Sequence, residues 1–371
     1  MLSFQNLHVV RVSKFWSLKN LFPASIDRNL LQLEELDLSN CGVREIVAEE
    51  GGETSATGFI FPRVTYLKLW ELPKLRTLYQ GIHTSECPML MKLMVYHCDH
   101  VKICQLDIGA QESLFLVEKV ILNLKILTMS IKDMSMILQG QFPEDLFHKL
   151  KILHMMNDKS AVFPLGLLQR FHNLQNLVLS ISSYKEIFSY EEVQKHAGTL
   201  SQIKDLMLCV LLDLNQMWKR NPKMDMILQN LEILNVLYCH NLINLVPFST
   251  YFRNLTTLDV CNCDGLINLV TYSTVFMVQL IKISIQECKM MIEVVANEGD
   301  VTIDEIIFNK LKQLSPARLT NLISFCSGNW SFKFPSLEKI DVSTCPNMKI
   351  FSPGALSLPR LRPIMVGVNK E

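Results

Sequence analysis

The stretch LEELDLSNC, residues 33–41, carries leucine at its first, fourth and sixth positions and ends on a cysteine. The same spacing of aliphatic residues, with valine, isoleucine or methionine allowed, recurs along the whole chain. Fourteen units share it, and their first positions are Leu7, Leu33, Val64, Leu90, Leu124, Leu150, Leu174, Ile203, Leu231, Leu255, Leu280, Leu311, Leu337 and Leu361. Successive first positions are 24–34 residues apart. A recurring period of this kind is the sequence signature of a repeat architecture.

Each unit predicts one short strand. Side chains alternate along a strand, so residues at offsets three and five should point into the coil and those at two, four and six toward solvent. Three buried aliphatic side chains contribute about 5–8 kcal/mol, which is too little to order about 25 residues. The units must therefore stack on one another. We predict an α/β solenoid, a leucine-rich-repeat horseshoe of about 14 irregular repeats with a parallel concave β-sheet.

Six cysteines share one place in the repeat, eight residues after the first aliphatic position. They are Cys41, Cys98, Cys239, Cys263, Cys288 and Cys345. This is the N/C position of the consensus L-x-x-L-x-L-x-x-N/C-x-L, where a small, weakly polar group that tolerates burial is suitable. A metal site would call for C-x-x-C pairs or clustered histidines, and the sequence has neither. We therefore expect these thiols to be structural, with no metal bound.

The overall composition excludes several classes of protein. Lys plus Arg and Asp plus Glu are both 36 in 371 residues, so no global field attracts nucleic acid. The longest uncharged stretch, residues 266–281, is polar in places and too short to span a bilayer. The first residues lack the features of a signal peptide, and the eleven cysteines fit a reducing compartment. A cytoplasmic protein without a membrane span is expected.

The array, taken as a single domain over residues 1–371, shows regular and irregular parts. The longest insertion lies near residues 104–123. Residues 40–64 and 287–311 share an E-[IV]-V-A segment, an acidic glycine tract and a phenylalanine, which indicates an internal duplication and a second, related half-module near residues 280–350. In the first copy we interpret Glu49, Glu50 and Glu53 as a solvated loop on the outer face, with a calcium or partner site as the alternative.

Some local signals concern single elements. The segments PEDLFHKL (143–150) and YEEVQKHAG (190–198) have a helical pattern and suit the convex side. Pro316 stands where the third aliphatic residue of its unit is expected, and it removes a donor from the ladder. That strand is therefore expected to be short or broken. The first unit begins within six residues of Met1 without a polar cap, which suggests a piece of a longer protein.

No catalytic or cofactor-binding motif is present. The sequence has no P-loop, G-x-G-x-x-G, H-E-x-x-H or G-x-S-x-G pattern. His97 beside Cys98 and His240 beside Cys239 could suggest a nucleophile and its base. Adjacent residues on a strand face opposite ways, which argues against both pairs. We expect no enzymatic activity and no cofactor.

The solvent-facing offsets of the second to fourth units predict a binding surface. An exposed aromatic and cationic cluster beside carboxylates has the composition of a protein-binding hot spot. An alternative is that neighbouring loops half-cover the aromatic rings. The candidate residues are Glu35, Asp37, Tyr66, Lys68, Trp70, Lys92, Met94 and Tyr96.

Several linkers add a family resemblance. The closing stretch LTNLISFCSGNWSFKFPSLEKIDVSTCPNMKIFSPG resembles the C-terminal repeats of plant intracellular immune receptors with coiled-coil, nucleotide-binding and leucine-rich-repeat domains, and so do SYKEIFSYEEVQKHAG, LEILNVLYCHNLINLVPFST and KMMIEVVANEGD. The resemblance implies a domain that senses pathogen effectors or effector-modified host proteins and, in a full-length receptor, contacts its own nucleotide-binding domain. This chain has no P-loop, so nucleotide binding and autonomous signalling do not follow from the resemblance.

Two other non-enzymatic functions are compatible with a solenoid. One is an intracellular leucine-rich-repeat scaffold or substrate-recruiting adaptor of ubiquitin-ligase type, which would need an adaptor-binding helical head before the first unit. The other is an extracellular receptor ectodomain, which would need an export signal and capping cysteine pairs. The sequence offers none of these features.

Overall fold

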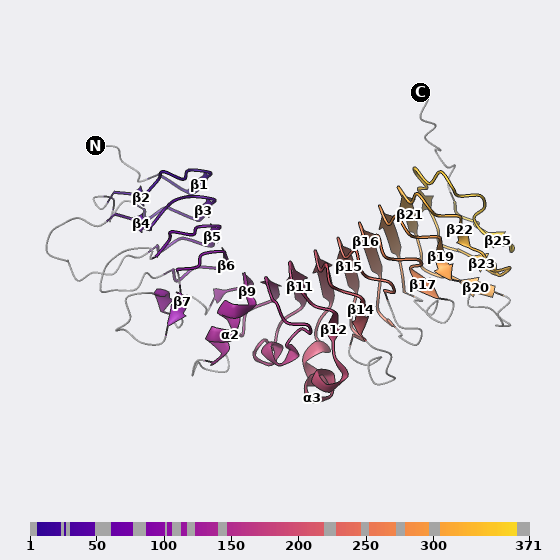
Figure 1. Cartoon of the computed structure of the whole chain (residues 1–371), viewed down its shortest axis with the longest axis horizontal. Coiled ribbons are helices and arrows are strands. Elements are labelled where there is room, and N and C mark those ends of the chain that lie inside the picture. Colours follow the sequence, from indigo (N-terminus) through magenta and orange to yellow (C-terminus); the bar gives the residue numbers. More distant parts are fainter. Residues whose placement is uncertain are drawn as a thin grey trace, which may run out of the picture. The chain divides into compact units, whose positions relative to one another are not determined.

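The computed structural model describes residues 6–23, 26, 30–48, 61–76, 87–100, 102–105, 113–116, 123–139, 147–218, 228–245, 252–271, 279–296 and 305–361. They form two compact units, Met1–Met156 with Arg170–Leu174, and Asn157–Gln169 with Gln175–Glu371. Each unit is a stack of coils in which each coil gives one strand to a parallel sheet (Figure 1). The leucine-rich-repeat solenoid is thus confirmed, whereas a single array over residues 1–371 stays a prediction.

The first unit contributes six strands to its sheet, all parallel to their neighbours. Their order is that of the chain: β1 (Val9–Ser13), β3 (Glu35–Ser39), β5 (Tyr66–Trp70), β6 (Lys92–Tyr96), β9 (Ile126–Ser130) and β10 (Ile152–Met156).

The second unit contributes seven strands in the same arrangement. They are β11 (Asn176–Ser180), β13 (Asp205–Cys209), β15 (Ile233–Leu237), β16 (Thr257–Cys261), β18 (Lys282–Gln286), β21 (Gln313–Ala317) and β24 (Lys339–Ile340). In both units every one of these strands begins two residues after the first aliphatic residue of its repeat. The strand expected after Leu361 lies outside the described residues.

The predicted alternation of side chains is confirmed and is clear in β16. Leu258 and Val260 are almost fully buried, while Thr257, Asp259 and Cys261 on the other face are half-exposed. The same two offsets are buried in the neighbouring strands, so the aliphatic residues form continuous rows through each stack of coils. The hydrophobic core runs along these rows.

Short outer ladders form a second set of strands. In the first unit β2 (Asn20–Phe22) pairs with β4 (Glu45–Val47). β7 (Lys102–Gln105), at the start of the predicted insertion, pairs in parallel with β8 (Ser113–Leu116) within it. Figure 1 shows the outer ladder β17, β19 and β22 of the second unit across the coils from β16 and β21. The ladders of that unit are β12 (Glu186–Phe188) with β14 (Gln216–Trp218), β17 (Val270–Thr271) with β19 (Glu293–Ala296) and β22 (Ser324–Cys326), and β20 (Glu305–Ile307) with β23 (Ser331–Lys333) and β25 (Leu356–Ser357).

One left-handed residue follows the strand in nearly every coil, a feature that the sequence did not reveal. Twelve non-glycine residues have φ between 49° and 66°, each seven residues after the first aliphatic position. Their amides continue the ladder beyond the strand, as when Asn262 N donates to Gln286 O at 2.9 Å. In the remaining coil of the described part, the equivalent residue Ile131 begins helix α2 (Ile131–Gln139). This sharp turn directs the residue that follows it into the coil.

Ile181 occupies such a left-handed position with φ of 49° and 43% of its side chain exposed. A β-branched residue is strained there, whereas asparagine tolerates this region and occurs at three equivalent positions. We expect Ile181→Asn to raise the free energy of unfolding by about 1 kcal/mol, measured as a shift of the urea midpoint. Ile281→Asn is the matched control, since Ile281 is 39% exposed and is absent from the left-handed set. An equal shift in both variants would contradict the strain argument.

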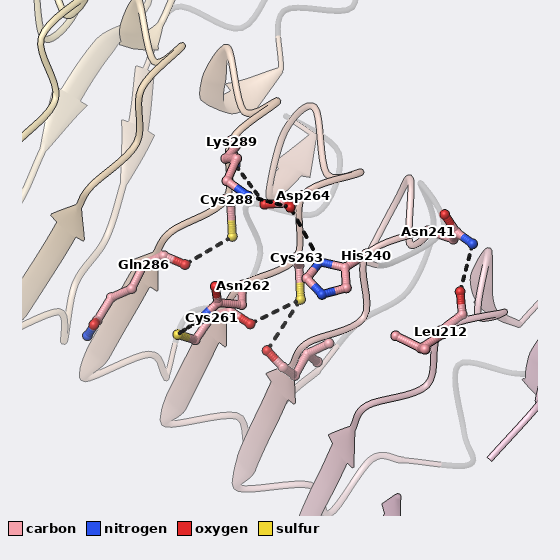
Figure 2. A network of polar contacts seen from close by, with 11 residues as sticks. Leu212, His240, Asn241, Cys261, Asn262, Cys263, Asp264, Gln286, Cys288 and Lys289 are labelled. Atoms are coloured by element: carbon pink, nitrogen blue, oxygen red, sulfur yellow. Dashed lines mark hydrogen bonds and ion pairs between the residues drawn. The ribbon is translucent and has the colours of Figure 1, made fainter. Parts of the chain in front are cut away.

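The predicted structural role of the cysteine row is confirmed. All six thiols are free, and five are buried, with Cys345 half-exposed. Each donates to the carbonyl two residues before it, for example Cys41 to Ser39 O at 3.2 Å and Cys288 to Gln286 O at 3.4 Å. Figure 2 shows Cys263, which also bonds the preceding coil through Val236 O at 3.5 Å. Cys41, Cys98, Cys263 and Cys345 therefore connect the turn after one strand to the coil before it.

The expectation of a broken strand at Pro316 is wrong, because β21 runs unbroken through the proline. Pro316 O accepts from Ser343 N at 3.2 Å on the β24 side. The N–H and C=O of one strand residue face the same neighbour, so the missing donor also faces β24. β24 is only two residues long and ends before it reaches the proline. The missing donor of Pro316 therefore leaves β21 at full length and faces a place that β24 does not reach.

The described helices are few. The pattern at 190–198 is confirmed as helix α3 (Tyr190–Leu200), whose N-cap Ser189 Oγ accepts from Glu192 N at 3.3 Å and which is kinked at His196. A 3₁₀ helix, η3, spans Leu165–Arg170. Residues 147–149 form a turn, and the rest of the predicted helix at 143–150 lies outside the described residues, as do Glu49, Glu50 and Glu53.

Candidate protein-binding surface

The eight candidate residues lie on three adjacent strands of the first unit, β3, β5 and β6. The register places Asp37 beside Lys68 and Lys68 beside Met94. The flanking rows align Glu35 with Tyr66 and Lys92, and Trp70 with Tyr96. All eight residues occupy the even offsets of their repeats, so they share one face of the sheet. We call them the sheet-face cluster.

The charges of the sheet-face cluster are paired within the sheet. Lys68 Nζ lies 3.2 Å from Asp37 Oδ2, and both side chains are mostly buried. Ser39 Oγ donates to the same carboxylate at 2.8 Å. Arg11 of β1 forms an ion pair with Glu35. These contacts fix the carboxylates and leave no isolated buried charge, which would be costly.

The aromatic rings hold the cations over their faces. The Lys92 ammonium lies 4.8 Å from the centre of the Tyr66 ring, and that of Lys68 lies 5.8 Å from the Trp70 ring. Tyr66 Oη donates to Met94 Sδ at 3.7 Å. The pKa of the Tyr66 phenol is raised by burial and further by the charges of Asp37 and Glu35, so the hydroxyl keeps its proton as a donor. A partner therefore meets side chains that are already ordered, which lowers the entropy lost on binding.

The expectation that every aromatic ring of the cluster is exposed is wrong for Tyr96. Its side chain is only 7% exposed because its ring lies between Trp70, at 4.7 Å and a tilt of 41°, and His97, stacked at 4.1 Å. Burial, and then the charge of Glu71, raise the pKa of its phenol. Tyr66 and Trp70 are half-buried and keep part of their surface for contact. Tyr96 thus packs against Trp70 and has almost no surface left for contact with a partner.

Arg11 completes the sheet-face cluster and was missed by the sequence reasoning. It sits at offset four of the first repeat, and the register places it beside Asp37. The same offset rule that selected the eight candidates would have found it. The omission came from considering only the second to fourth repeats.

The two histidine–cysteine pairs do not form catalytic dyads. Burial raises the pKa of Cys98 to about 12, and its thiol donates to Leu69 O and Tyr96 O, whereas the His97 ring is stacked on Tyr96. His240 Nδ1 lies 3.5 Å from Asp264, and Cys239 donates to Leu237 O (Figure 2 shows the histidine contact). Both thiols are therefore buried and hydrogen-bonded to backbone carbonyls.

Two further classes of site were searched in the part of the chain that the structure describes. No three histidine, cysteine, aspartate or glutamate side chains there are grouped to hold a metal ion. Among the same residues, no helix has the length and apolar character needed to cross a membrane.

The repeats match one protein family over most of the chain. Residues 1–42, 122–251 and 247–366 match the family described as plant disease resistance protein RPS2-like, leucine-rich repeats. The chain belongs to this family. Its leucine-rich-repeat solenoid is of the type that usually forms a non-catalytic protein-interaction scaffold. No curated protein sequence is significantly similar to the chain.

Two solved structures are similar at low identity. One is described as the TLR13–ssRNA13 complex, with 15% identity, a TM-score of 0.47, and 97% of this chain and 57% of that chain covered. The other is the plant peptide hormone receptor RGFR1 in complex with RGF2, with 13% identity, a TM-score of 0.23, and 91% and 73% covered. The present chain thus spans little more than half the length of the first.

Proposed function

We propose that this plant disease resistance repeat array is a non-enzymatic protein-interaction domain of intracellular immune-receptor type. It recognises pathogen effectors or guarded host proteins in the cytoplasm, and within a full-length receptor it also contacts the receptor's own nucleotide-binding domain. The family match supports the type of receptor. The sheet-face cluster supports the place of contact.

The observation that carries this proposal is the ordered group of Tyr66, Lys68 and Trp70 on an otherwise solvent-facing sheet. Protein-binding hot spots are rich in tryptophan, tyrosine and cations held in position by their neighbours. Here the Lys92 ammonium lies 4.8 Å from the centre of the Tyr66 ring, and the Lys68 ammonium lies 5.8 Å from that of the Trp70 ring. Both rings remain half-exposed. A partner that covers Trp70 would desolvate both its ring and the neighbouring ion pair of Lys68 with Asp37.

The test measures binding of the purified chain to a panel of individually purified pathogen effectors and their host targets by surface plasmon resonance. For each protein that binds, we expect Trp70→Ala to weaken the affinity at least tenfold, which corresponds to about 1.4 kcal/mol. Tyr238→Ala is the matched control, because Tyr238 is an aromatic residue 45% exposed beside β15 in the second unit. Unchanged affinity in Trp70→Ala, or equal losses in both variants, would refute the sheet-face cluster as the contact.

A further inference from the structure

A second exposed row lies on the second unit, away from the sheet face. Four isoleucines, Ile243, Ile267, Ile292 and Ile323, stand twelve residues after the first aliphatic position of four consecutive repeats. Their side chains are 40–50% exposed. The two preceding repeats carry polar residues at the same offset, Glu186 and Asn215. Ile243 N donates to Asn215 O, so the ladder continues into the isoleucines. Single exposed aliphatic residues are ordinary, but an unbroken row is not. We call these four residues the isoleucine row.

Two further apolar side chains widen the isoleucine row. Leu212 is 51% exposed, and its carbonyl accepts from Asn241 Nδ2 at 2.7 Å, two residues before Ile243 (Figure 2). Met290 is 54% exposed and precedes Ile292 by two residues, with buried Met291 between them. Six half-exposed side chains amount to roughly 400–500 Å² of apolar surface, a size that often marks a binding site.

The polar residues beside the row do not repel an apolar partner. Asp264 lies 3.0 Å from Lys289 Nζ and 3.5 Å from His240 Nδ1, so its charge is compensated within the coil stack (Figure 2). The lysine and the histidine hold the pKa of this carboxyl below its usual range, against the opposing effect of burial. The row is thus flanked by a nearly neutral polar strip, the arrangement of an apolar core with a polar rim.

The backbone of the row decides which partner fits. Ile292 N donates to Ile267 O at 2.9 Å, Ile323 N donates to Ile292 O at 2.8 Å, and Lys349 N donates to Ile323 O at 2.9 Å. These bonds occupy the amides of Ile292 and Ile323 and the carbonyls of Ile267, Ile292 and Ile323. An added strand could not pair with these groups and would bring unpaired amides onto an apolar surface. A helix satisfies its own amides, so an apolar row suits a helix better than an extended peptide.

The dimensions of the row agree with a helical partner. Neighbouring coils are about 4.8 Å apart, as in any sheet, and an α-helix advances about 5.4 Å per turn. A helix lying along the stack therefore brings one aliphatic residue per turn, at i, i+4, i+7 and i+11, close to each isoleucine. A self-associated dimer is less suitable, because stable interfaces bury about 800 Å² on each partner.

We propose that the isoleucine row docks an amphipathic α-helix of a partner protein. The helix carries an aliphatic stripe about three turns long and polar residues on both sides of it. This site is separate from the sheet-face cluster and does not depend on the function proposed above. Loss of binding at one surface can therefore be distinguished from loss at the other.

The test uses a fluorescein-labelled 15-residue helical peptide with leucine at i, i+4, i+7 and i+11, and an isomer whose leucines are spread around the helix. Fluorescence anisotropy with the full chain is expected to show saturable binding of the first peptide only. The double variant I267K/I292K should weaken this binding at least tenfold. The matched control is I281K, which replaces an isoleucine 39% exposed directly before β18 and outside the isoleucine row. Where the double lysine variant does not fold, as judged by circular dichroism, I267N/I292N takes its place.

Several results would overturn the proposal. One is the absence of saturable binding, and another is equal binding of the two peptides or equal loss in I281K. If the chain binds phosphatidylcholine vesicles, and I267K/I292K loses this binding while I281K keeps it, the row is a lipid-binding surface instead. A dimer in sedimentation velocity that the double variant dissociates would assign it to a second copy of this chain.

Discussion

Phe325→Ala is expected to lower the free energy of unfolding by about 3–5 kcal/mol, the largest single effect in the second unit. Phe325 is 1% exposed in β22, where its ring stacks on Phe351 at 4.5 Å and meets the edge of Phe332 at 5.5 Å. Phe334 and Phe308 lie at 6.1 and 6.4 Å. Each such aromatic pair adds about 0.5–1.5 kcal/mol beyond simple burial. Truncation leaves a cavity among the four remaining rings.

The measurement is urea unfolding followed by circular dichroism, with hydrogen exchange to locate the effect. Because a solenoid couples neighbouring coils only, exchange should accelerate first in the last described coils. Phe15→Ala is the matched control, since Phe15 is 60% exposed and should change stability by less than about 0.5 kcal/mol. Similar losses in the two variants would show that the phenylalanine cluster does not stabilise the fold.

Leu258→Ala is expected to cost about 2–5 kcal/mol. Leu258 is fully buried in β16, and the register places it between Leu234 and Ile283. The removed atoms leave a gap in the aliphatic row that joins three coils, which cannot close without shifting a strand. Thermal unfolding is expected to show a lower midpoint and a broader transition, because the stack is interrupted in its interior.

The neighbouring Thr257→Ala supplies the control. Thr257 lies on the other face of the same strand and is half-exposed, so its truncation should cost less than about 1 kcal/mol. If Thr257→Ala proves as destabilising as Leu258→Ala, the assignment of inward and outward faces in β16 is wrong.

The strands and the buried faces were predictable because they depend on side-chain spacing alone. The offsets of LEELDLSNC place Leu36 and Leu38 inside and Glu35 and Asp37 outside, as the structure has them. The cysteine row was predictable for the same reason, since Cys41 has a fixed place in the repeat.

Features that depend on contacts between one repeat and the next were not predictable. The phenylalanine cluster joins two positions of the repeat: Phe325 and Phe351 each stand fourteen residues after the first aliphatic residue of their repeat, and Phe308 stands three residues before Leu311. The period of the sequence does not show that these two positions meet. The left-handed turns were missed because Ile181 and Val210 are poor residues for that conformation, which the stack imposes on them. The error at Pro316 arose because the direction of its missing donor is fixed by the register with β24.

The sheet-face cluster was predictable in composition but not in exposure. Offsets two, four and six identified Trp70 and Tyr96 as outward-facing, yet the tilt of one ring over the other buries Tyr96. Side-chain packing across a register of strands is not contained in the period of the repeat. For this reason Trp70 and Tyr66, and not Tyr96, are the better positions for mutagenesis.

Hydroxyl-radical footprinting of the chain with and without a bound effector or host protein tests the central claim most directly. The account predicts that oxidation of Tyr66, Trp70 and Met94 decreases on binding, while Tyr238 of the second unit is oxidised as before. Full reactivity of all three sheet-face residues in the complex, with protection elsewhere, would contradict the claim that this face of the sheet binds the partner.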